Sequence, residues 1–109
     1  MELTAMQLTA KDFKKSVVEA DGPVLVNFWG SWCIPCKQTE RVLQDLSEGD
    51  LDISIFRVNI NRNPGLRAHY QIAGVPNFLL FRDGEERARI VGAQSVRQLE
   101  DFIREHLED

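Results

Sequence analysis

Residues 24–29, Val-Leu-Val-Asn-Phe-Trp, constrain the fold more than any other part of the sequence. The run lacks the alternation of polar and apolar side chains that a half-exposed strand shows. It predicts a strand buried on both faces of a sheet, with helices packed over each face. Asn27 is the only polar residue in it.

The flanking segments alternate between helical and strand patterns. Apolar spacing predicts a helix over 10–20, with Thr9 before it as an N-cap, and an amphipathic helix that ends near residue 49. Residues 53–58 are a second strand candidate. A strand, a helix and a strand in this order form a βαβ unit, so the two strands should run parallel.

The second half of the chain predicts an antiparallel pair and a closing helix. We interpret residues 63–65 as a turn before a short helical piece, and residues 77–81 as a third strand. The hairpin signal Asp83-Gly84 joins this strand to a more polar edge strand that ends at Val91. Ser95 and Gln98 form a capping box for a helix to about residue 107. The expected fold is α/β, a central mixed sheet with helices on both faces.

Length and charge limit the possible functions. With 109 residues, the chain is expected to form a single domain over 1–109. Its 13 Lys and Arg against 17 Asp and Glu give a net charge of −4, which argues against nucleic acid and anionic membranes as partners. Met1 to Thr4 lack the basic start of a signal peptide, and no apolar run approaches the ~18 residues of a membrane span. We therefore expect a cytoplasmic protein, and a monomer.

Only two cysteines are present, Cys33 and Cys36. They are too few for a disulfide-stapled mini-domain or a four-thiolate metal site. The two histidines, His69 and His106, lie far along the chain, so we expect surface positions for both and no metal site.

The two cysteines separate a buried strand from an amphipathic helix, and this position suggests redox chemistry. Free N–H groups and the positive end of the dipole at a helix N-terminus favour a thiolate. Cys33, the outer one, is then the nucleophile, and Cys36 attacks the mixed disulfide that forms. Two alternatives to a redox role are that the cysteines form half of a metal site or that they are inert thiols. The βαβ context favours thiol–disulfide exchange over both.

Residues 28–37, Phe-Trp-Gly-Ser-Trp-Cys-Ile-Pro-Cys-Lys, resemble the active-site segment of the thioredoxin family, which usually reads Trp-Cys-Gly-Pro-Cys-Lys. The resemblance covers nearly the whole chain. Its other matches, in order, are 24–29, 59–64, Gly74-Val75-Pro76, 81–85 and 91–93. By family analogy, the Val75-Pro76 bond should be cis and lie against the disulfide.

The resemblance implies a thiol–disulfide oxidoreductase that reduces protein disulfides. It implies no bound cofactor beyond the Cys33-Cys36 disulfide itself, and electrons that arrive from NADPH through thioredoxin reductase. An apolar surface would hold the substrate peptide, made by Trp32, Ile34, Pro35, Gly74, Val75, Pro76, Gly92 and Ala93. Asn27, Arg57, Trp29 and Lys37 would modulate the site.

The sequence departs from the family pattern below the cysteines. Asn27 stands where the family usually has a buried Asp that takes the proton of the deeper thiol, and an amide cannot accept that proton. Water or Glu40, one helical turn beyond Cys36, is the alternative route, although Glu40 is more readily explained as a solvated residue. Arg57 stands where Lys is common. A cation beside a neutral amide stabilises thiolate, so we expect a weaker reductant than a typical member.

Ile34 replaces the usual Gly between the cysteines and should narrow the approach to Cys33. Arg41 replaces a frequent Pro, which implies a straighter helix. Two rival functions stay open: an oxidase or isomerase of the same chemistry, and a non-catalytic binding module with the same fold.

Overall fold

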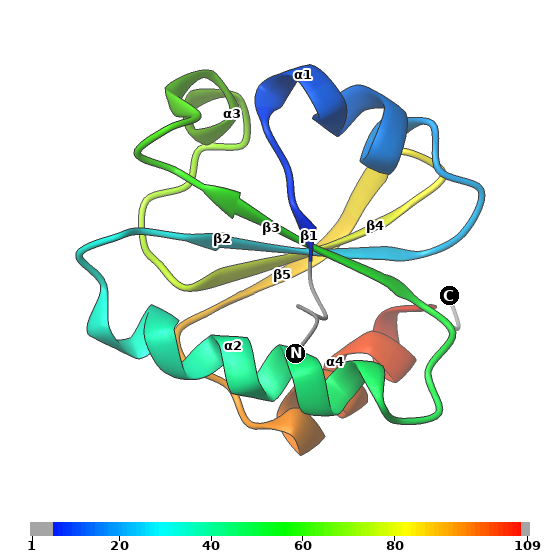
Figure 1. The fold of residues 1–109 in the computed structure, drawn as a ribbon. Coiled ribbons are helices and arrows are strands. Elements are labelled where there is room, and N and C mark those ends of the chain that lie inside the picture. Colours follow the sequence, from blue (N-terminus) through cyan, green and yellow to red (C-terminus); the bar gives the residue numbers. More distant parts are fainter. Residues whose placement is uncertain (1–5, 108–109) are drawn as a thin grey trace.

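A five-stranded mixed sheet in the order β1-β3-β2-β4-β5 forms the centre of the fold in the computed structural model, which describes residues 6–107 (Figure 1). The strands are β1 Met6–Gln7, β2 Val24–Trp29, β3 Ser54–Asn59, β4 Asn77–Arg82 and β5 Glu85–Val91. β1, β3 and β2 run parallel, and β4 and β5 are each antiparallel to their neighbour. The mixed sheet expected from the sequence is confirmed.

Helices cover both faces of this sheet (Figure 1). On one face lie α1 Ala10–Phe13, the π-helical turn η1 Lys14–Val18, and α3 Pro64–His69; on the other lie α2 Ile34–Ser47 and α4 Val96–Leu107. No helix within the described residues is long and apolar enough to cross a membrane.

β2 lies at the middle of the sheet and contributes to both cores, as its apolar run predicts. Val26 and Phe28 point into the core under α1 and α3, and Leu25 into the core shared with α2 and α4. Because side chains alternate along a strand, Asn27 points to the α2 side, where it is fully buried. The end of β2 therefore leads into the loop before α2, and the neutral amide of Asn27 lies beneath that helix.

Several local predictions are confirmed. In the capping box, Ser95 N donates to Gln98 Oε1 over 2.8 Å and Gln98 N to Ser95 Oγ over 3.1 Å. β4 and β5 form the hairpin predicted at Asp83-Gly84. α2 is continuous through Arg41, and its being straighter than is usual in the family stays a prediction.

Three local predictions need correction. The helix over 10–20 is α-helical only to Phe13 and then π-helical to Val18, because Glu19 N bonds to Lys14 O five residues back, over 2.9 Å. The Thr9 side chain does not cap it; its hydroxyl lies 3.2 Å from Asp12 Oδ2 instead. Pro64 begins α3 rather than sitting in a turn, since a first-turn Pro needs no N–H partner. The expectation that Met1 to Thr4 are not the start of a signal peptide concerns residues outside those that the structure describes.

Candidate active site

Cys33 is the N-cap residue of α2, at the point where the loop from β2 meets the helix. Its Sγ accepts a hydrogen bond from the backbone N of Cys36 over 3.2 Å. The two cysteines form a disulfide, with their Cα atoms 5.3 Å apart, and both are buried. Pro35 lies in the first turn, where its missing N–H leaves no gap. A helix start thus directs an N–H group at the outer sulfur, as the sequence predicts.

A second loop faces this sulfur from the far end of the chain. Cys33 Sγ lies 3.7 Å from the carbonyl O of Val75, and the Val75-Pro76 bond is cis. The Pro76 carbonyl accepts a hydrogen bond from Gly92 N over 2.7 Å. The structure therefore places Val75 against the outer sulfur and joins Gly92 to Pro76, and the Val75-Pro76 bond is cis as the resemblance implies.

Large apolar side chains are exposed around the buried disulfide. Trp32 is 65% exposed and Ile34 71% exposed, and the rest of the motif, Pro35 and Lys37, is exposed as well. Ala93 is exposed, while Gly74, which follows the α3 helix, sits next to Val91. Val91 is 54% exposed and belongs to this apolar surface. The sequence does not single it out, because the strand that ends at Val91 is mostly polar and has the pattern of an edge strand.

Beneath α2, Asn27 and Arg57 face each other across β2 and β3. Arg57 Nε donates to Asn27 Oδ1 over 3.3 Å, and the guanidinium carbon lies 4.5 Å from the centre of the Trp29 ring. Both partners are buried. The predicted pairing of a cation with a neutral amide is confirmed.

Glu40, which we expected to be a solvated residue, adds a carboxylate to this pair. It is exposed, as expected, but its Oε2 lies 3.9 Å from Arg57 Nη1. Burial lowers the pKa of the Arg57 guanidinium, and the charge of Glu40 raises it part of the way back. Arg57 is still a cation at neutral pH, because a guanidinium does not lose its proton in proteins. The cluster beneath α2 therefore consists of the buried Arg57 cation, the neutral Asn27 amide and the exposed Glu40 carboxylate, whose negative charge lies near that cation.

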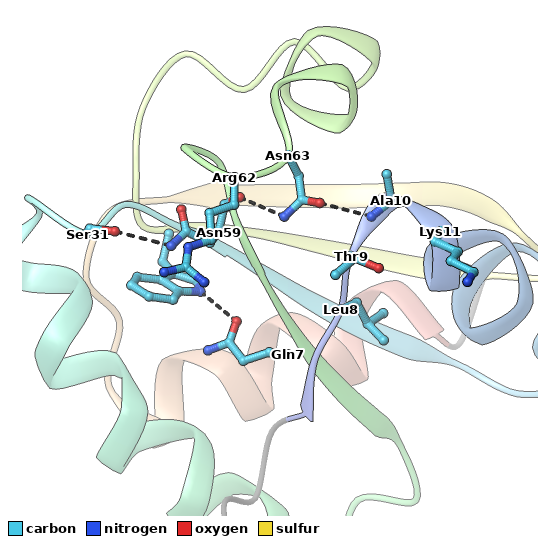
Figure 2. A pocket seen from close by; sticks show the side chains of 10 residues that line it. Gln7, Leu8, Thr9, Ala10, Lys11, Ser31, Asn59, Arg62 and Asn63 are labelled. Atoms are coloured by element: carbon cyan, nitrogen blue, oxygen red, sulfur yellow. Dashed lines mark hydrogen bonds between the residues drawn. The ribbon is translucent and has the colours of Figure 1, made fainter.

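Beside the disulfide loop lies a hollow of about 560 Å³ (Figure 2). Its residues come from three segments: Gln7, Leu8, Thr9, Ala10 and Lys11; Trp29 and Ser31; Asn59, Arg62 and Asn63. Sequence reasoning missed this network, although the Asn at 59, 61 and 63 repeat at every second position. The hollow adjoins the cysteines through Ser31, two residues before Cys33.

Both histidines are peripheral. His69 is exposed against the Tyr70 ring, and His106 packs edge-on to Phe102. Within residues 6–107 no group of three or more His, Cys, Asp or Glu is placed to hold a metal ion.

An α/β fold with a Cys-x-x-Cys disulfide at a helix start defines a class, the thiol–disulfide oxidoreductases. Comparison with known proteins makes the assignment narrower. The family model described as Thioredoxin matches residues 4–105, and the chain belongs to the thioredoxin family. Its members are protein-disulfide reductases, and this chain is a thiol–disulfide oxidoreductase of that kind.

Curated relatives agree over almost the whole chain. Thioredoxin of Rickettsia felis is 37% identical over 100 residues, which is 91% of this chain and 95% of the relative. Thioredoxin of Buchnera aphidicola subsp. Schizaphis graminum is 39% identical over 103 residues, 94% and 95% respectively. Thioredoxin of Mycobacterium bovis is 33% identical over 103 residues, 90% and 89% respectively.

Proposed function

We propose that Cys33 is the nucleophile and Cys36 the resolving thiol. The Cys33 thiolate attacks one sulfur of a substrate disulfide; that S–S bond breaks and a substrate thiolate leaves. Cys36 then gives its proton to water or to Glu40, and its thiolate attacks Cys33 Sγ, closes the Cys33-Cys36 disulfide and releases the second substrate thiolate. Two electrons pass from the dithiol to the substrate. The hydrogen bond from Cys36 N to Cys33 Sγ carries this assignment, because it stabilises charge on the outer sulfur.

The apolar surface around the disulfide is the proposed docking site for the substrate peptide. It comprises Trp32, Ile34, Pro35, Gly74, Val75, Pro76, Gly92 and Ala93. Exposure of Trp32 and Ile34 beside a buried sulfur supports it, since exposed apolar patches mark interaction sites.

Re-reduction of the disulfide completes the cycle. The family implies disulfide substrates and a reductase in general; we propose thioredoxin reductase, with electrons from NADPH. A monomer of one domain in the cytoplasm stays our prediction.

Insulin-disulfide reduction with dithiothreitol tests the proposed function. Turnover well above the dithiothreitol background is the expected result. Turnover equal to that background would favour the rival in which the fold is only a binding module.

The Asn27 and Arg57 pair supports the prediction of a weaker reductant. Asn27→Asp adds a negative charge under α2, destabilises the thiolate form and so makes the potential more negative. We expect a shift on the order of 10–30 mV, because Arg57 is in place to neutralise part of the new charge. Titration against glutathione measures it.

Gln98→Glu is the matched control for this titration. It adds the same charge on α4, where a carboxylate oxygen can keep the bond from Ser95 N, and should leave the potential unchanged. An Asn27→Asp potential that is unchanged or less negative would show the charge argument to be wrong.

A further inference from the structure

The loops at the two ends of the strands differ in charge. The loops at the edge with the disulfide, residues 8–9, 30–33, 60–63, 70–76 and 92–95, contain no Asp or Glu. The loops at the opposite edge, residues 19–23, 48–53 and 83–84, contain six: Glu19, Asp21, Glu48, Asp50, Asp52 and Asp83. A chain of net charge −4 thus keeps its disulfide edge free of loop carboxylates.

Cations lie at this disulfide edge. Arg62 follows β3, Lys37 is in the first turns of α2, and both are exposed with no ion pair to any residue in 6–107. Arg67 on α3 donates from Nε to the backbone carbonyl of Ile72 over 3.3 Å, which does not neutralise its charge. An electrostatic field from such groups steers acidic partners toward this edge.

The hollow beside Ser31 offers a place for one acidic side chain. Its two asparagine side chains already have partners: Asn59 Nδ2 donates to Ser31 Oγ over 3.2 Å, Asn63 Nδ2 donates to Asn59 O and Asn63 Oδ1 accepts from Ala10 N, the last two over 2.9 Å. Figure 2 shows Arg62 at the Ser31 end of the hollow and Lys11 at the far end.

Among residues 6–107, no carboxylate lines the hollow; Asp12 reaches only its rim, through the Thr9 hydroxyl. The charged residues in the described lining of the hollow, Arg62 and Lys11, are therefore both cations. This selects an anionic group, and a carboxylate matches the fork of Arg62.

We propose that the disulfide edge recognises proteins that carry Asp or Glu beside their disulfide, with one carboxylate bound by Arg62 in the hollow. This inference rests on the proposed function, since it names the substrate class of the same site. The acidic loops at the opposite edge repel such a partner and so orient the encounter.

The test uses the reduced full chain and three synthetic peptides that each contain one disulfide. The peptides differ only in the residues that flank their cysteines: Asp, Ser or Lys. We expect second-order rate constants in the order Asp, Ser, Lys, with a ratio of about tenfold between the first and last at low salt. The ratio should fall toward one at roughly 0.5 M salt, as screening requires.

Arg62→Glu and Arg104→Glu form the matched pair of variants. Both change the net charge equally, but Arg104 is exposed in the last turn of α4, away from the disulfide edge. Arg62→Glu should lower the Asp-to-Lys ratio several-fold, and Arg104→Glu should preserve it. Arg62→Gln, a milder change, should lower it less, and it provides the same readout if the Glu variant folds poorly.

Equal rates for the three peptides, or equal loss in the two Glu variants, would overturn the proposal. Hydroxyethyl disulfide, a small neutral substrate, separates this from failure of the proposed function. A chain that reduces it but does not discriminate among the peptides lacks only the acidic preference. A chain that cannot reduce it lacks the activity itself.

Discussion

Cys33→Ser will lower the rate of disulfide reduction to the background rate. Cys36→Ser will stop the reaction one step later, with the substrate still bound covalently to Cys33. A serine hydroxyl cannot form the mixed disulfide, so the first variant has no intermediate. In the second variant Cys33 is still the N-cap of α2 and keeps the backbone N–H of residue 36. Attack proceeds, but no thiol is present to release the product.

Mass spectrometry with a disulfide substrate distinguishes the two variants. Cys36→Ser should accumulate a covalent adduct that dithiothreitol removes, and Cys33→Ser should show none. Adducts on Cys36 in the Cys33→Ser protein, at a rate similar to the other variant, would reverse the assigned roles. Folding is checked by circular dichroism, because both side chains are buried.

Phe28→Ala should cost about 3–5 kcal/mol of unfolding free energy. Phe28 is fully buried, and its ring centre lies 6.1 Å from that of Tyr70. It sits next to the end of β2, so the strand that leads into the disulfide loop depends on this packing. The expected cost is a large share of the ~5–15 kcal/mol that stabilises a typical domain.

Urea unfolding measures this loss. Phe28→Leu, which keeps most of the apolar volume, should cost much less, and Ile34→Ala, at a position 71% exposed, should cost no more than about 0.5 kcal/mol. The smaller change also gives a value if the alanine variant does not fold. Equal losses for Phe28→Ala and Ile34→Ala would contradict the description of the core.

Patterns that act over a few residues predicted the fold well. The apolar run of β2 and the capping box at Ser95 depend on side chains close in sequence, and both are confirmed. β1 was missed because two residues carry no periodicity; it exists through its pairing with Phe56 and Arg57 of β3.

The features of the site that depend on the start of α2 could be predicted from the sequence. The features that depend on packing between distant segments could not. The Cys33 N-cap follows from the position of the motif between strand and helix. The contact of Glu40 with Arg57 requires α2 to lie over β3, which brings together residues 17 positions apart. The hollow requires the segment around β1 to lie beside the turn after β3, and no local pattern carries that information.

The pH dependence of Cys33 alkylation tests the central claim most directly. With Cys36→Ser, only Cys33 reacts with iodoacetamide, so the rate reports its ionisation. The helix start and the hydrogen bond from residue 36 N should hold the pKa of the Cys33 thiol well below the value of about 8.5 for a free cysteine. A rate that rises with its midpoint near about 8.5 would contradict the account.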